Sequence, residues 1–155
     1  MARWPTGAKA VEFLLDRGKL EGLGDADLGA ATEALLARAT RRLSTAAAAL
    51  DGEDVEGAYA AAYDAYRMSA EALLIRQGLR ATGGEGSHMT VEDAVGAQFA
   101  DRVAGFSKPT FERLRRTRHL AQYFDPAEPP IEQADAEWAI EVSSETVAAV
   151  EQLLR

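Results

Sequence analysis

The chain has 155 residues, of which 47% are hydrophobic and 27% charged, and this composition excludes an intrinsically disordered protein. The absence of cysteine excludes a disulfide framework, a thiolate nucleophile and a cysteine-based zinc site. A formal net charge of −8 argues against a general nucleic-acid coat, because sequence-independent affinity comes from neutralising phosphates. We expect one domain over residues 1–155. No apolar run approaches the ~20 residues of a membrane span, and none follows the first residues, so we expect a cytoplasmic protein without membrane contact.

Two helices are predicted in the first third of the chain. Pro5 suits the first turn of a helix that ends before Gly18, and its apolar residues recur at helical spacing: Val11, Leu14 and Leu15. A break rich in glycine and aspartate follows. Asp27 can then cap a second helix that ends near Leu50, with apolar positions at Leu28, Leu35, Leu36, Ala39 and Leu43.

A third helix is predicted from about Asp54 to Leu79, because this stretch has no proline and only one early glycine. Its apolar residues step by three and four and therefore share one stripe: Tyr59, Tyr63, Tyr66, Ala70, Leu73 and Leu74. An aromatic stripe at this spacing predicts core rather than a binding site. Beside it, Asp64 and Arg67 lie three residues apart. They form either an intrahelical pair or a buried or interface contact.

Three more helices are predicted in the second half of the chain. A glycine-rich loop precedes a fourth helix that starts at Thr90, with two acids in its first turn, where the helix dipole favours them. The fifth helix has Pro109 in its first turn and ends at about Tyr123 or Phe124, and the last covers about 131–154. No β-alternation is found. The pattern predicts an all-α bundle of five to six helices with two long central ones.

Basic residues are concentrated around the fifth helix. Residues 102–119 contain six basic side chains and one acid, so this segment carries +5 and the rest of the chain −13. A local basic patch on an acidic body suits a small anionic ligand or a limited RNA contact. A solvated helix face close to an acidic partner surface is the alternative.

Helical geometry sorts the side chains of this basic helix into rows. Arg118 lies on the same side as three apolar residues, Phe111, Leu114 and Ala121, so it must be paired or face a polar crevice. The adjoining row contains Arg115, His119 and Gln122, and Tyr123 lies one turn past His119. Such an arc of cations, imidazole, amide and phenol can hold a phosphate through bidentate arginine contacts.

Four short motifs together carry a family resemblance. They are Ala-Tyr-x3-Tyr-Asp-Ala-Tyr-Arg at 58–67, Gln-Gly-Leu-Arg at 77–80, Gly-x-Gly-x-His at 84–88, and Arg-Arg-x-Arg-His-x3-Tyr at 115–123. In this combination and order the chain resembles HEPN domains, most closely a compact actinobacterial-type branch. The resemblance extends over about residues 5–155. It implies a helical bundle that dimerises, and many members are metal-independent endoribonucleases.

The resemblance also implies roles for particular residues. The HEPN motif is an arginine, commonly followed by a polar residue, with a catalytic histidine four to six residues after the arginine. Arg118 matches the arginine and His119 the polar position, which places Tyr123 at the histidine position. An alternative alignment uses Arg113 and His119 but puts Leu114 at the polar position. The family mechanism is attack of a 2′-hydroxyl on the adjacent phosphate, in a site composed of the motifs of two protomers.

The expected site residues therefore fall into three groups. Arg118, His119 and Tyr123 are the expected catalytic residues, and Arg115, Arg116, Gln122 and His88 the expected RNA or phosphate contacts. His88 supplies the missing imidazole if its loop folds over the fifth helix; otherwise it caps the fourth helix. Asp64 and Arg67 are expected to be structural or interface residues. No cofactor is expected, and two histidines on separate elements argue against a metal site.

Three functions remain open at this stage. The first is a HEPN ribonuclease of toxin or defence type. The second is a non-catalytic HEPN module that binds RNA, a nucleotide, or a nucleotidyltransferase or antitoxin protein, because degenerate HEPN domains bind such ligands. The third is a dimeric scaffold in which arginines pair with acids across the interface. The expected assembly in each case is a homodimer.

Overall fold

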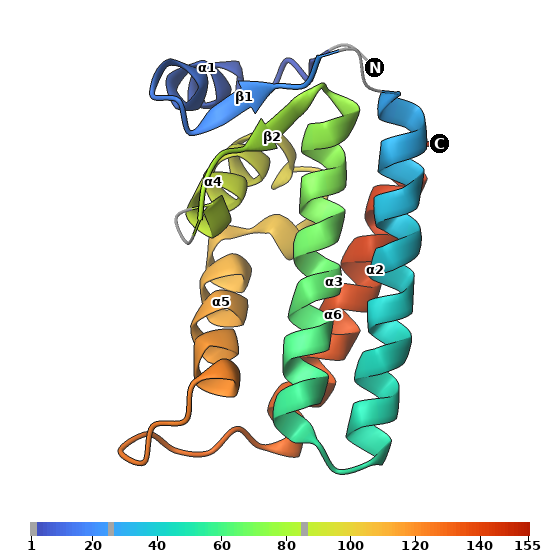
Figure 1. Cartoon of the computed structure of the whole chain (residues 1–155), viewed down its shortest axis with the longest axis vertical. Coiled ribbons are helices and arrows are strands. Elements are labelled where there is room, and N and C mark those ends of the chain that lie inside the picture. The colour runs from blue at the N-terminus through green and yellow to red at the C-terminus, as the bar shows by residue number, and fades with distance from the viewer. Residues whose placement is uncertain (1–2, 25–26, 85–86) are drawn as a thin grey trace.

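The computed structural model describes residues 3–24, 27–84 and 87–155. These residues form six α-helices, one 3-10 turn and two short strands (Figure 1). In chain order the elements are α1 (Ala8–Asp16), β1 (Leu20–Gly22), α2 (Leu28–Asp51), α3 (Val55–Arg76), β2 (Leu79–Ala81), α4 (Ser87–Phe99), η1 (Ala104–Phe106), α5 (Lys108–Gln122) and α6 (Gln133–Leu153). The predicted all-α class is confirmed.

Three long helices form the body of the fold. In Figure 1, α3 lies between α2 on one side and α4 and α5 on the other, while α6 crosses behind α2 and α3. The predicted Asp27 cap is present, since Asp27 accepts a hydrogen bond from the Ala30 amide (3.0 Å), and Asp54 at the predicted start of the third helix accepts one from the Gly57 amide (2.9 Å). These side chains satisfy amide groups that have no partner within the helix, which explains where α2 and α3 begin.

The tyrosine stripe of α3 forms the core, as predicted. Tyr59, Tyr63 and Tyr66 are between 0% and 4% exposed. Each hydroxyl contacts a different segment: Tyr59 donates to the Leu114 carbonyl of α5 (3.3 Å), Tyr66 donates to the Gly105 carbonyl of η1 (2.7 Å), and Tyr63 bonds to α4. Buried hydroxyls need such partners. The stripe therefore both fills the core and sets the positions of α4, η1 and α5.

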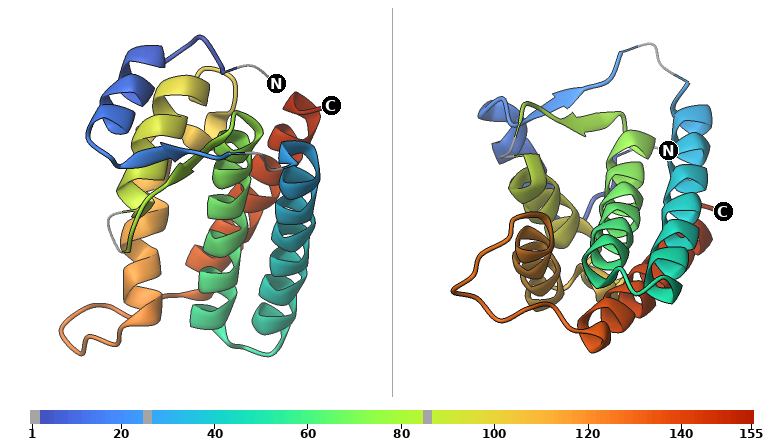
Figure 2. Two further views of the ribbon diagram at one scale, coloured as in Figure 1. Left: turned by 45° about the horizontal axis from the view of Figure 1, so that its top comes forward. Right: turned by 60° about the horizontal axis from the view of Figure 1, so that its bottom comes forward.

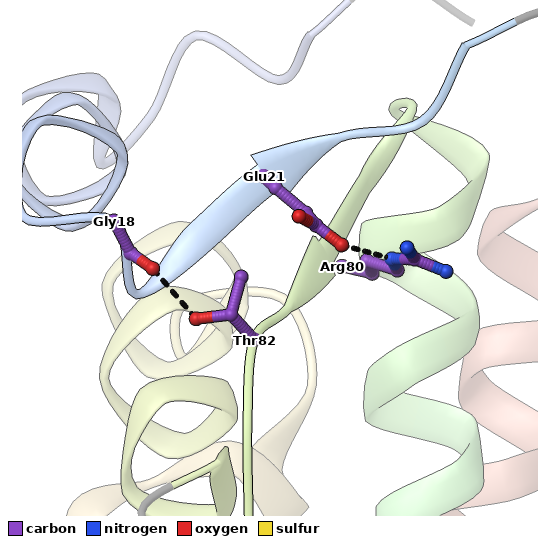
Figure 3. A network of polar contacts seen from close by, with 4 residues as sticks. All are labelled: Gly18, Glu21, Arg80 and Thr82. Atoms are coloured by element: carbon purple, nitrogen blue, oxygen red, sulfur yellow. Dashed lines mark hydrogen bonds and ion pairs between the residues drawn. The ribbon is translucent and has the colours of Figure 1, made fainter.

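A small antiparallel sheet was not expected from the sequence. β1 and β2 pair with Leu20 opposite Ala81 and Gly22 opposite Leu79. The third helix was predicted to reach Leu79, but α3 ends at Arg76 and the chain turns at Gly78, whose φ of 76° suits glycine. Figure 3 shows two side-chain contacts across this sheet: Arg80 forms an ion pair with Glu21, and the Thr82 hydroxyl donates to the Gly18 carbonyl (2.6 Å).

The fourth helix also differs from its prediction. α4 begins at Ser87 rather than Thr90, so His88 lies in its first turn and not in the glycine-rich loop. The two acids predicted for the first turn consequently lie one turn further on. After α5, residues 123–132 form a long excursion that projects from the body before α6 starts, as both views of Figure 2 show.

None of the helices in the described ranges combines the length and apolar character needed to cross a bilayer.

Candidate functional site

A pocket of about 800 Å³ lies beside α5. Its walls come from α3, α4, α5 and the segment after α5. The lining residues are Tyr63, His88, Met89, Arg115, Arg116, Arg118, His119, Leu120, Tyr123 and Glu128. Six of the seven residues expected to act in catalysis or phosphate contact are thus gathered around one space.

The apolar face of α5 sets the direction of these polar side chains. Phe111 and Leu114 are 5% and 0% exposed and pack into the core beside α3. Because residues three and four apart share a face, this packing keeps Arg118 close to α3. The Arg118 side chain is half-buried, and its guanidinium carbon lies 5.5 Å from the centroid of the Tyr63 ring. A cation in this position is held by the ring while it lines the pocket.

His88 is held against the same tyrosine. A hydrogen bond of 2.7 Å joins His88 Nδ1 and the Tyr63 hydroxyl, and the two rings are nearly parallel at 5.8 Å between centroids. Burial raises the pKa of Tyr63 to about 12, so its phenol stays neutral at physiological pH. Burial, with the positive charges of Arg67 and Arg118, lowers the pKa of His88 below its ordinary value, so its imidazole is predominantly neutral at pH 7.

Arg115 is anchored by an acid from α4. Its Nε donates to Glu92 Oε2 at 3.0 Å, and the Glu92 side chain is only 7% exposed. A buried carboxylate needs such a partner, so the pair joins α5 to α4. In the described part of the chain, Arg116 and Arg118 form no ion pair. Their charges are therefore not neutralised by a contacting acid.

The exposed end of α5 carries the other two motif residues. The rings of His119 and Tyr123 lie 4.9 Å apart at 45°, and both side chains are exposed at the pocket. Tyr123 follows the last residue of α5 and has extended backbone geometry. Its phenol is thus placed where the helix gives way to the projecting segment.

Some expected site residues lie elsewhere. Gln122 lines a neighbouring groove of about 470 Å³ and not the main pocket. Asp64 and Arg67 are half-buried on α3 and do not line it either. The intrahelical partner of Arg67 is Glu71, at 3.2 Å, and not Asp64. Arg67 thus forms the expected kind of intrahelical ion pair, but with the acid one turn after it and not with the acid one turn before it.

The two residues of the alternative motif, Arg113 and His119, have different surroundings in the structure. The Arg113 guanidinium carbon lies 3.6 Å from the centroid of a Trp138 ring, so this side chain packs against α6. Arg113 does not line the pocket that contains His119. Arg118, His119 and Tyr123, by contrast, all line the same pocket.

Three polar residues of this site, Tyr63, Glu92 and Glu128, were not assigned to it from the sequence, and neither were the apolar Met89 and Leu120. Tyr63 was assigned to the core alone, and Glu92 was interpreted as a first-turn acid. The available signal was spacing: His88 and Glu92 are four residues apart and so share a face of α4 if the helix starts early enough. No group of three residues suited to hold a metal ion occurs in the described ranges. The arginines and imidazoles that line the pocket are suited to an anionic ligand.

Comparison with known proteins gives one match. A family model described as HEPN domain matches residues 32–153, which include α3, α4, α5 and the pocket. No curated protein and no solved structure matches the chain significantly.

Proposed function

The chain belongs to the HEPN domain family, and on this premise we propose that its pocket binds the phosphate backbone of RNA and cleaves the strand without a metal ion. The observation that carries the proposal is the composition of the pocket. Three arginines and two histidines line it, although the whole chain has a formal net charge of −8. Glu128 is the one acid among the lining residues, so the pocket carries a net positive charge, and a concave site of net positive charge concentrates anionic ligands.

The chemistry of the lining residues supports cleavage as well as binding. Arg118 suits the charge that develops on phosphorus when a 2′-hydroxyl attacks, because a guanidinium contacts two phosphate oxygens at once. His119 occupies the polar position of the family motif, and an imidazole can both accept and donate a proton. Tyr123 is a hydrogen-bond donor to the phosphate in this proposal.

The pocket rim supports a homodimer. Four large apolar side chains are exposed in the described ranges, and three of them lie near the pocket: Met89, Tyr123 and Phe124, which are 44%, 53% and 92% exposed. Apolar side chains grouped on one face favour association. A second copy seated at this rim brings two motifs together, as the family mechanism requires.

A second candidate function is binding without cleavage. The observation that favours it is Tyr123, which stands where the family motif has its histidine. A phenol is a poorer general base than an imidazole. In this alternative the pocket binds RNA, a nucleotide, or a nucleotidyltransferase or antitoxin partner. The toxin or defence context belongs to the first candidate.

RNA binding is expected to depend steeply on salt. Each phosphate neutralised on a single strand contributes about −0.7 to the slope of log K against log salt, so three arginine contacts predict a slope of about −2. Fluorescence anisotropy with a labelled 20-nucleotide RNA, in EDTA between 50 and 200 mM salt, measures this slope. Gel analysis of the same samples detects cleavage to a 2′,3′-cyclic phosphate. No binding at the lowest salt would contradict the proposal, and binding without cleavage selects the second candidate.

Arg113→Ala separates the two motif alignments. Because Arg113 stacks on Trp138 away from the pocket, we expect RNA affinity and cleavage rate within about twofold of the unchanged protein. The same substitution is expected to lower stability slightly, since a cation–π contact is worth about 1 kcal/mol. A loss of cleavage as large as that of an Arg118 variant, in a folded protein, would instead support the Arg113–His119 alignment.

A further inference from the structure

The proposed cleavage lacks an imidazole at the motif position immediately after α5. Tyr123 occupies it, and the pocket must provide a proton acceptor from elsewhere if the 2′-hydroxyl is to attack. His119 is one candidate, next to Arg118 in the sequence. The pocket contains a second imidazole, that of His88, which comes from α4 and which the family motif does not include.

The His88 imidazole is fixed through one ring nitrogen, as catalytic imidazoles commonly are. Its Nδ1 is engaged by the Tyr63 hydroxyl at 2.7 Å, and the parallel packing of the two rings limits rotation of the imidazole. Tyr63 is 4% exposed and lies in the middle of α3, so the support is rigid. With Nδ1 occupied, Nε2 is the nitrogen left to contact a ligand. A ring nitrogen fixed by one partner determines the tautomer of the other.

We propose that His88 is the general base of this site, supplied by α4 of the same chain in place of the histidine that the motif position lacks. This inference rests on the proposed function. Tyr63 is a positioning residue in it: His88 Nδ1–H donates to the Tyr63 oxygen, which leaves the lone pair on Nε2. The arrangement puts an imidazole and the Arg118 guanidinium on the same supporting tyrosine ring.

The step balances without a metal or a redox partner. His88 Nε2 takes the proton of the ribose 2′-hydroxyl as the 2′-oxygen bonds to the adjacent phosphorus. The bond between phosphorus and the 5′-oxygen breaks, and that oxygen takes a proton from protonated His119. The products are a 2′,3′-cyclic phosphate and a 5′-hydroxyl, and exchange with water restores both histidines. Arg118 contacts the phosphate oxygens while the charge develops.

The charges around His88 favour its neutral form. Burial is the main cause of its lowered pKa, and the charged and titratable groups nearby come from three helices: Tyr63, Asp64 and Arg67 of α3, Glu92 of α4, and Arg115 and Arg118 of α5. The arginines oppose protonation, whereas Asp64 alone favours it among the groups that act directly on His88. A base must be unprotonated to act, so cleavage is expected to fall as the pH drops through the lowered pKa of His88.

His88→Gln is expected to lower kcat by about 10²-fold, the typical contribution of one general base, and to change the Kd for RNA by less than about threefold, because the arginines remain. Tyr63→Phe keeps the imidazole but removes the hydrogen bond that orients it, so kcat is expected to fall about tenfold. The double variant is expected to match His88→Gln alone, since Tyr63 acts only through His88. A purely structural role for Tyr63 would make the two losses multiply. Circular dichroism melting shows whether each variant is folded.

The outcomes separate this inference from the function it rests on. Equal cleavage by the unchanged protein and folded His88→Gln overturns the role of His88 and leaves RNA cleavage standing. Binding without any cleavage overturns the role of His88 together with the first candidate function, and absence of binding overturns the proposed pocket itself. The pH profile adds a second readout: a fall in kcat/KM on the acid side that disappears in folded His88→Gln supports the inference, and an acid-side fall that persists unchanged in that variant overturns it.

Discussion

Arg118→Gln is expected to reduce the rate of RNA cleavage by about 10²- to 10³-fold, the loss typical of removing one group that stabilises transition-state charge. The side chain is half-buried against Tyr63, lines the pocket and has no ion-pair partner in the described ranges. Within the fold its charge therefore contacts the Tyr63 ring but no acid, which leaves it available to a ligand. Single-turnover cleavage of a labelled RNA at saturating protein measures the effect without a contribution from binding.

Two further variants give this experiment its controls. Arg41→Gln removes the same charge from an exposed position on α2 and is expected to leave cleavage unchanged. Arg118→Lys keeps the charge but loses the planar fork, so an intermediate rate is expected. If the glutamine variant cleaves as fast as the unchanged protein, Arg118 has no part in the chemistry, and the motif assignment on α5 is wrong.

Phe106→Ala is expected to lower the free energy of unfolding by about 3–5 kcal/mol, the range for truncating a buried phenylalanine. Phe106 is 0% exposed in η1, immediately before α5. Its ring stacks on Phe111 at 5.5 Å and contacts Tyr66 at 5.6 Å. Removing it leaves a cavity at the point where α5 is attached to α3. The helix that carries most of the pocket's cations is therefore expected to lose its anchor.

Phe13→Ala is the matched control for this substitution. The Phe13 ring is 53% exposed on α1 and contacts Arg17 at 4.8 Å. Because little of its surface is buried, its truncation is expected to cost about 1 kcal/mol or less. Urea unfolding followed by circular dichroism gives both values. Equal losses for the two variants would contradict the burial of Phe106 and the packing of η1 on α5.

A substantial part of the fold follows from local patterns. Asp27 and Asp54 precede periodic apolar runs, and a short polar side chain at that position caps a helix wherever the rest of the chain lies. The tyrosines of α3 step by three and four, and that spacing alone places them on one face. The strands lacked any such signal. Each has three residues, too few for an alternating pattern, and they pair across a separation of about 59 residues.

The site, like the fold, was predictable from the sequence only in part. The sequence by itself determined how the polar side chains of α5 are arranged: helical periodicity places Arg118 on the apolar side and Arg115 with His119 in the adjoining row, and the chemistry follows from the side chains. Only the tertiary structure decided that His88 reaches Tyr63, that Glu92 takes Arg115, and that Arg113 turns to Trp138. Periodicity within one helix specifies which face a residue occupies. It carries no information on which other helix covers that face, because this depends on how the whole core packs.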